Sequence, residues 1–335
     1  MKRKLASVQR IKELEPIVNA ELIERATVLG WQLVVKKGEF SVGDLCIYCE
    51  VDSLMPDVPE FEFLKARGMR IHTMRLRGQI SQGICFPLSI VEGYGLLPED
   101  MIEGQDVTEA MGVTQYIDEL PPNLIGEAKG YMPVDIPKSD IVRVQTLQPL
   151  LDKYAGTLCY ASEKLDGESL TNYLRDGGMF GVTSKEVDFL ETPASMHWQV
   201  ARAMGMEEKL RSIGRNISLQ GEIVGEGIKK NKYKLKGKHV FFYNAFDIDT
   251  HSYYNYADFI ALMKKLELNH VPIVNDALVL PSSIQELVKL SIGKSALRDT
   301  QREGIVVCPL VEVNDMIGRV IFKVISPDFL IKHNE

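Results

Sequence analysis

The chain has 335 residues, 45% hydrophobic and 25% charged, the balance of an ordinary globular protein with room for two domains. Its formal net charge of −7 excludes a basic coat along the whole chain, so nucleic-acid binding would need local basic patches. No apolar run reaches the length of a membrane span, and the N-terminus lacks the apolar core of a signal peptide. The five cysteines form no paired CxxC motifs, which indicates reduced core thiols and a cytoplasmic protein.

The first 112 residues contain short strand-like runs separated by turns, at 26–35, 44–51, 71–77 and 82–88. Their number and length predict a small barrel, and an OB-type β-barrel is expected at this size. Basic side chains gather in the same region, at Arg67, Arg70, Arg75 and Arg77. They indicate either an edge that contacts nucleic-acid phosphates or an ordinary solvated face.

Residues 113–145 are rich in proline and glycine, including Pro121 and Pro122, and are predicted to form an irregular linker. From 146 to 335 strands and helices mix without strict alternation, which predicts an α+β domain. Helices are expected at 192–214, with Thr192 as its N-cap, and at 256–266 and 283–290, the last capped by Ser283. Strands are expected at 217–223, 240–248, 304–309 and 319–325.

A lysine follows the strand-like run 157–161 and opens a tight connection to a second run at 170–174. Lys164 is followed by one spacer, Asp166 and Gly167, and the glycine permits a turn. A lysine whose ammonium has lost its proton is a nucleophile that forms covalent adducts. Taken alone, Lys-x-Asp-Gly also fits a plain surface turn.

The order of the later segments changes that interpretation. After Lys164-x-Asp-Gly come Glu222-Ile-Val, Phe246-Asp-Ile, Glu303-Gly-Ile-Val and a strand lysine, Lys323. This series resembles the covalent nucleotidyltransferases, which include polynucleotide ligases and mRNA capping enzymes. Ser162-Glu-Lys164 and Glu222-Ile-Val-Gly-Glu-Gly-Ile228 are similar to the RNA ligase versions of those motifs. An OB-type domain ahead of the catalytic domain, with 136–145 just upstream of the lysine, further resembles the type-5 RNA ligases.

The resemblance implies an ATP-dependent reaction in which Lys164 forms lysyl-AMP, AMP passes to an RNA 5′-phosphate, and a 3′-OH displaces it. It assigns the catalytic role to Lys164 and Lys323, the latter on the α-phosphate. The carboxylates of Asp166, Glu222 and Glu303 are the expected ligands of Mn²⁺ or Mg²⁺, because these ions prefer oxygen donors. The nucleotide-binding residues implied are Glu163, Arg143, Ser184, Lys185, Glu222, Phe246 and Lys323.

Individual roles follow from the same resemblance. Glu163 would read the adenine amino group, Phe246 would stack on the base, and Arg143 would grip a phosphate. Without the resemblance, Phe246 fits an ordinary position in a strand core. Where related ligases carry Ser-Arg, this chain has Ser184-Lys185, and a lysine lacks the paired hydrogen bonds of a guanidinium.

The expected fold is therefore an OB-type barrel (1–112), a linker (113–145) and an α+β nucleotidyltransferase domain of ATP-grasp-like adenylyltransferase type (146–335). The expected substrate is RNA, or a nicked duplex with RNA on the 3′-OH side, sealed by a monomer. Alternatives are a DNA ligase or capping enzyme, and a non-catalytic RNA-binding OB protein. Six lysines between 229 and 238 fit either a solvated hairpin or a segment along the nucleic acid or the triphosphate.

Overall fold

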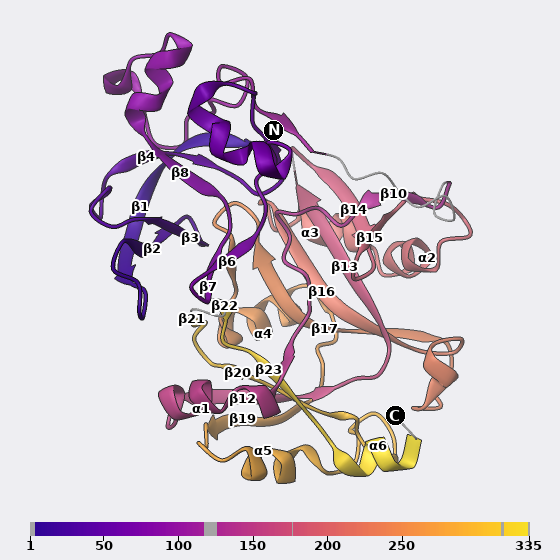
Figure 1. The fold of residues 1–335 in the computed structure, drawn as a ribbon. Helices are drawn as coiled ribbons and strands as arrows, with labels where there is room; N and C mark the ends of the chain where they lie inside the picture. The colour runs from indigo at the N-terminus through magenta and orange to yellow at the C-terminus, as the bar shows by residue number, and fades with distance from the viewer. Residues whose placement is uncertain (1–3, 117–125, 176, 316–317, 334–335) are drawn as a thin grey trace. The chain divides into compact units, whose positions relative to one another are not determined.

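This computed structural model describes residues 4–116, 126–175, 177–315 and 318–333 (Figure 1). In its N-terminal sheet, one long strand, β1 (Ala6–Pro16), joins the two halves. The first half of β1 pairs with β4 and the second half pairs with β2, both antiparallel. At the start of the pairing with β2, the register shifts between Ile11 and Glu13. Such a bulge bends a strand and increases its twist, so one strand serves both halves of a curled sheet.

The N-terminal sheet is antiparallel, in the order β3-β2-β1-β4-β8. Its remaining strands are β2 (Ile23–Val28), β3 (Trp31–Lys36), β4 (Leu45–Cys49) and β8 (Ile84–Pro87). Two short pairs accompany it: β5 (Ser53–Leu54) with β9 (Thr114–Gln115), and β6 (Met74–Leu76) with β7 (Gln79–Ser81). This is the expected OB-type architecture.

Both faces of the N-terminal sheet are covered by apolar side chains, as β4 illustrates. Ile47 and Cys49 belong to one hydrophobic cluster, whereas Cys46 and Tyr48 belong to another. Because successive strand residues point to opposite faces, a strand that is apolar throughout is buried on both sides. All five cysteines of the chain are free and buried.

The C-terminal part contains two larger sheets. One has seven antiparallel strands in the order β10-β15-β14-β13-β16-β17-β18, and the other has five in the order β11-β23-β20-β12-β19. In the first are β10 (Ala128–Tyr131), β13 (Glu168–Arg175), β14 (Met179–Thr183), β15 (Val187–Phe189), β16 (Ile217–Gly225), β17 (Lys238–Asp247) and β18 (Ser252–Tyr253). In the second are β11 (Val142–Arg143), β12 (Leu158–Lys164), β19 (Ile273–Val279), β20 (Gly304–Pro309) and β23 (Phe322–Ile325). A separate pair joins β21 (Asn314–Asp315) and β22 (Gly318–Arg319).

Six α-helices lie among these strands in the described residues. They are α1 (Gln148–Tyr154), α2 (Met196–Ala203), α3 (Met206–Arg211), α4 (Tyr256–Lys265), α5 (Ile284–Ser291) and α6 (Pro327–His333). Apolar residues of α2, α3 and α4 share a hydrophobic cluster with β13, β16 and β17. Those of α1 and α5 share another with β12, β20 and β23. Each sheet thus buries one face under helices, as α+β domains require.

The prediction of one helix over 192–214 is wrong, because the segment starts its helix later and forms two helices. Its first helix begins at Met196, because Ser195 rather than Thr192 accepts the capping hydrogen bond from the backbone N–H of Trp198. The helix breaks at Gly205, which has a φ of +62° and serves as the N-cap of α3. A left-handed backbone cannot continue a right-handed helix, so one apolar pattern became two helices. The predicted capping of 283–290 by Ser283 is confirmed.

The segment predicted as a linker, 113–145, supplies strands to both parts of the chain. Thr114–Gln115 pairs with Ser53–Leu54, and Ala128–Tyr131 pairs with β15. The contacts divide the chain into two units, residues 1–119 with 315–318, and residues 120–314 with 319–335. Pro121 and Pro122 lie outside the described residues.

Across the described ranges, no helix combines the length and the apolar character needed to cross a membrane.

Substitution of Gly205 by alanine tests the cause of the break between α2 and α3. A side chain at φ +62° is strained, so Gly205→Ala should lower the free energy of unfolding by about 1 kcal/mol. Asparagine tolerates this conformation better than alanine, so Gly205→Asn should lower the free energy of unfolding by less. Urea denaturation of both variants measures the difference, and equal losses would contradict the explanation.

Candidate active site

Lys164 is the last residue of β12 and lies next to β20, with Gly304 as its partner across the strands. Its Nζ lies 2.8 Å from both Oε1 and Oε2 of Glu303, a residue 139 positions away in the sequence. Both side chains are largely buried. The strands approach closely here, since a Cβ at Gly304 would lie 2.1 Å from the carbonyl oxygen of Val324. The structure therefore brings two predicted site residues into direct contact.

Glu222 lies on β16, in register with Ser169 on β13, and closes the turn that follows Lys164. One of its carboxylate oxygens accepts a hydrogen bond from the backbone N–H of Gly167 at 3.1 Å. Burial raises the pKa of Glu222 to about 7, although the nearby ammonium of Lys164 acts in the opposite direction. A Cβ at Gly167 would lie 2.2 Å from the carbonyl oxygen of Ile223, so only glycine fits this turn.

Lys323 and Arg143 add positive charge to the same region. Strand β11 runs parallel to β23, and this pairing sets Arg143 opposite Lys323. Burial lowers the pKa of Lys323, and the neighbouring charge of Lys164 lowers it further. Three cations thus gather from three strands, the arrangement expected around a bound phosphate chain.

Two residues that sequence reasoning did not single out hold Asp166. Lys232 places its Nζ 2.6 Å from a carboxylate oxygen of Asp166. The hydroxyl of Tyr233 accepts a hydrogen bond from the backbone N–H of Asp166 at 2.8 Å. The lysine-rich composition of 229–238 marked this segment, but it could not indicate which lysine turns inward.

The three predicted metal ligands lie near enough to one another for the charges of Glu303 and Asp166 to act on Glu222. Among the described residues, no group of three or more Asp, Glu, His or Cys side chains could hold a single ion. Each predicted carboxylate has its own partner instead: Glu303 contacts Lys164, Asp166 contacts Lys232, and Glu222 accepts from Gly167. The two lysines offset the repulsion between carboxylates that lie this close together.

Glu163 is buried beside the loop that follows α5, and no described contact joins it to Lys164. Its Oε2 accepts a hydrogen bond from the backbone N–H of Ala296 at 2.9 Å, whereas Oε1 has no partner among the described residues. Burial raises the pKa of Glu163, against the hydrogen bonds of Ser295 and Ala296. A buried acceptor without a donor is costly, and a ligand amino group would satisfy it.

Ser184 and Lys185 lie in the turn between β14 and β15. The Ser184 hydroxyl accepts a hydrogen bond from the backbone N–H of Val187 at 3.2 Å, so it stabilises the turn. Lys185 forms an ion pair with Asp140 at 2.6 Å. Because the charge of Asp140 also acts on Lys323, Lys185 is linked to the cation cluster through this carboxylate.

Phe246 lies near the end of β17, in register with Ser218, whereas Phe241 is the partner of Glu222. Its ring is fully buried and makes edge contacts with His251 and Tyr253, with ring centroids 4.9 Å apart in each case. No described contact joins Phe246 to Lys164. This environment is that of a strand core, the simpler interpretation of the sequence.

The four arginines of the N-terminal part differ in their surroundings. Arg70 is committed internally, because it forms an ion pair with Asp52 at 2.6 Å and lies 3.8 Å from the centroid of the Tyr116 ring. Arg70 therefore stabilises the N-terminal part through these two contacts. Arg67, Arg75 and Arg77 are exposed.

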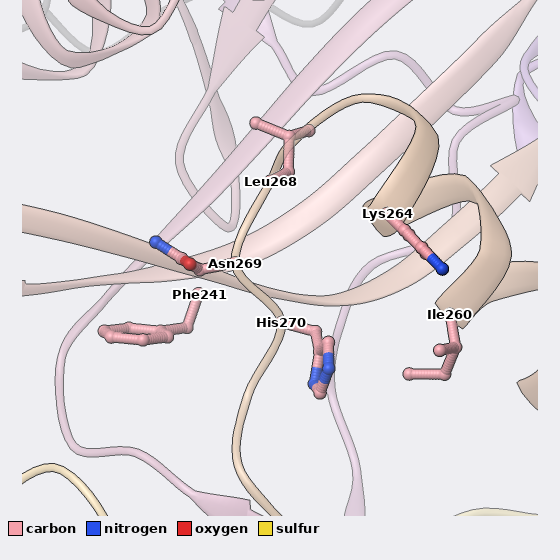
Figure 2. A pocket seen from close by; sticks show the side chains of 6 residues that line it. All are labelled: Phe241, Ile260, Lys264, Leu268, Asn269 and His270. Carbon is pink, nitrogen blue, oxygen red and sulfur yellow. The ribbon is translucent and has the colours of Figure 1, made fainter.

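A pocket in the C-terminal part contains none of the predicted site residues. Figure 2 shows its lining, with Ile260 and Lys264 on α4, Phe241 on β17 and Leu268, Asn269 and His270 on the segment after the helix. The chemistry expected of the chain needs the lysine and carboxylate cluster, so we place the candidate active site at Lys164 and not in this pocket.

Both parts of the chain are similar to known proteins. A family model described as RNA ligase matches residues 158–325, and one described as an OB-fold domain matches residues 5–88. A solved structure of Naegleria gruberi RNA ligase with PPi is 36% identical, covers 99% of each chain and has a TM-score of 0.58. Mutants of that ligase with AMP and Mn, and with ATP and Mn, are 35% identical with the same coverage and TM-score. No curated protein matches the chain significantly.

The fold is thus an OB-fold domain followed by a nucleotidyltransferase-like domain, as predicted. The chain belongs to the RNA ligase family. The sequence-based identification as an RNA ligase with an N-terminal OB-fold domain is confirmed.

The raised pKa of Glu222 predicts a cost in stability. A carboxyl whose folded pKa is about 7, above its ordinary value, destabilises the fold when charged, and this cost disappears as the pH falls below 7. Glu222→Gln should therefore stabilise the metal-free protein at pH 8 by about 1–3 kcal/mol. The gain should shrink towards pH 5, where the native carboxyl is protonated.

Urea unfolding of both proteins at pH 8 and pH 5, in the presence of a chelator, measures this difference. A stabilisation that is the same at both pH values would show that the charge of Glu222 is not its source.

Proposed function

We propose that the chain is an ATP-dependent ligase that forms lysyl-AMP on Lys164 and seals 3′-OH and 5′-phosphate ends of RNA. One observation carries the proposal: the end of β12 holds Lys164 against Glu303, with Glu222 and Lys323 close by. The structures of Naegleria gruberi RNA ligase mutants with AMP and Mn, and with ATP and Mn, support ATP and a divalent cation as cofactors.

In the first step the neutral amine of Lys164 attacks the α-phosphorus of ATP. The N–P bond forms while the bond to the bridging oxygen breaks, and pyrophosphate leaves with that electron pair. Before the attack, the Lys164 ammonium would pass one proton to Glu303, which already accepts its hydrogen bond. The second proton would leave Nζ for water as the N–P bond forms. An ammonium has no lone pair, so the contact between Lys164 and Glu303 is the resting form of the nucleophile.

In the second step an RNA 5′-phosphate attacks the adenylyl phosphorus, and its new anhydride bond releases the Lys164 amine. In the third step an RNA 3′-OH attacks the activated 5′-phosphate, a phosphodiester forms and AMP leaves. Lys323 and Arg143 would stabilise negative charge on the phosphates in these steps, because fixed cations in a partly dry site need little reorganisation.

The buried polar groups fit the expected cofactors. Glu163 has one buried acceptor oxygen that the adenine amino group would satisfy. Phe246 would stack on adenine only if its ring left the contacts with His251 and Tyr253. Asp166, Glu222 and Glu303 would hold Mn²⁺ or Mg²⁺ directly or through water, and oxygen donors suit both ions. When bound, the ion would neutralise charge on the triphosphate.

The OB-fold domain would grip the strand that flanks a nick, with RNA on the 3′-OH side. Exposed Arg67, Arg75 and Arg77 would contact the backbone, a mode of binding that suits an enzyme acting on ends rather than sequences. We further propose a monomer that acts in the cytoplasm, where its five free cysteines stay reduced.

Covalent labelling tests the first step. Incubation with α-³²P-ATP and Mn²⁺ should transfer label to the protein, and the acid-labile label should be discharged by added pyrophosphate. Lys164→Ala should abolish labelling, because the nucleophile is lost. Lys265→Ala, which removes an exposed lysine of α4, should label normally.

Labelling by GTP but not ATP would favour a capping enzyme. The absence of label with either nucleotide and several metals would leave a non-catalytic RNA-binding protein as the better account.

Removal of the exposed arginines tests the role of the OB-fold domain. The double variant Arg75→Ala/Arg77→Ala should weaken binding of a nicked duplex and reduce the slope of log K against log salt by about 1–2. Lys12 is an exposed lysine on a different strand, β1, so Lys12→Ala should leave that slope unchanged. An unchanged slope in the double variant would place the RNA elsewhere.

A further inference from the structure

Asp166 is held at two points by consecutive residues of the lysine-rich segment 229–238. The ammonium of Lys232 lies 2.6 Å from its carboxylate, and the hydroxyl of Tyr233 accepts from its backbone N–H. Tyr233 is buried in a small apolar cluster with Leu165, the residue after Lys164. This segment is therefore packed against the turn that carries the nucleophile.

Lys232 differs from the other lysines of its segment. Those five side chains are exposed, whereas the Lys232 side chain is only 13% exposed. Its Nζ also lies 4.5 Å from the centroid of the Phe329 ring on α6. Removing an ammonium from water is costly, and both the carboxylate and the aromatic face offset that cost. These two contacts account for the burial of this one ammonium among six lysines.

The backbone around Lys232 is held in an unusual conformation. Lys229, Lys230, Asn231 and Lys234 have φ values of +44°, +59°, +46° and +51°. The Asn231 side chain stabilises the loop, because it donates to the carbonyl oxygen of Leu235 at 2.9 Å and accepts from its N–H at 3.1 Å. Left-handed conformations in residues other than glycine cost energy and gather at functional sites. The loop thus aims Lys232 at Asp166.

On the basis of the proposed lysyl-AMP chemistry, we propose that Lys232 binds the β- and γ-phosphates of ATP. It exchanges Asp166 for these phosphates when Asp166 takes a divalent cation. Asp166 is two residues from Lys164, so a cation beside it is near the triphosphate that Lys164 attacks. Lys323 and Arg143 come from β23 and β11, and Lys232 comes from the β16–β17 connection. As pyrophosphate departs it carries the electron pair of the broken bond, and the ammonium of Lys232 stabilises that charge.

A purely structural role for the Lys232–Asp166 pair makes a different prediction. If Lys232 only orients Asp166 and the turn, its loss should weaken the binding of every nucleotide that contacts this turn. If Lys232 contacts the β- and γ-phosphates, its loss should weaken the binding only of ligands that carry these phosphates. The two roles can be distinguished without any chemical step by comparing AMP with a triphosphate analogue whose α and β phosphorus atoms are joined by a methylene group, because that bond does not break.

The test measures equilibrium binding of α,β-methylene-ATP and of AMP, both with Mn²⁺, by calorimetry. Lys232→Met should weaken binding of the triphosphate analogue by about tenfold or more, the range for a lost charge-assisted hydrogen bond. AMP affinity should stay within about twofold, since AMP lacks both phosphates. Lys236→Met, at an exposed position of the same segment, is the matched control and should change neither value. Lys232→Arg keeps the charge and should retain most of the affinity.

A second readout uses 5′-adenylylated RNA, which enters the reaction after pyrophosphate has left. Lys232→Met should seal it at a rate within about threefold of the native enzyme. Equal losses of AMP and analogue binding, or none, would overturn the phosphate contact. A native protein that binds the analogue but forms no lysyl-AMP when given ATP would overturn the proposed function and leave the role of Lys232 measurable. A native protein that binds neither nucleotide would overturn both.

Discussion

The balance of charge around Lys164 is the constraint on which the rest of the candidate site depends. A partly buried lysine next to other cations is unfavourable unless carboxylates are placed between them. Here each contact joins two separate elements: Glu303, just ahead of β20, meets Lys164 on β12, and Lys232 meets Asp166. Strand register sets the contact between Lys164 and Glu303, so a shift by one residue would turn Lys164 to the wrong face.

Close backbone packing provides the geometry for this balance. At Gly167 and Gly304 an added Cβ would lie 2.2 Å and 2.1 Å from carbonyl oxygens of neighbouring strands. The two glycines therefore let the turn after Lys164 lie against β16 and let β20 lie against β23. The Glu222 carboxylate then reaches the N–H of Gly167, and its burial accounts for its raised pKa.

Local patterns predicted much of the fold. The strands at 217–223, 240–248 and 304–309 and the helix at 256–266 recur within a few residues in the structure. Errors arose where one residue overrides a pattern. Gly205 divides a helix whose apolar spacing continues through it, and β1 was missed because its charged second half masks the strand signal. The sequence also grouped Arg70 with the basic surface residues, yet it forms an ion pair with Asp52 and packs against the Tyr116 ring.

The sequence by itself determined the family, because the order of Lys164, Glu222, Glu303 and Lys323 within strand-like runs resembles the motif series of the RNA ligases. It also determined the two-part organisation, since the composition of the β-rich and mixed regions differs. Only the tertiary structure decided which charges meet. The parallel pairing of β11 with β23 sets Arg143 opposite Lys323, and the strained loop after β16 selects Lys232 from six lysines. These contacts join residues far apart in the chain, and their partners depend on strand register, which local periodicity does not encode.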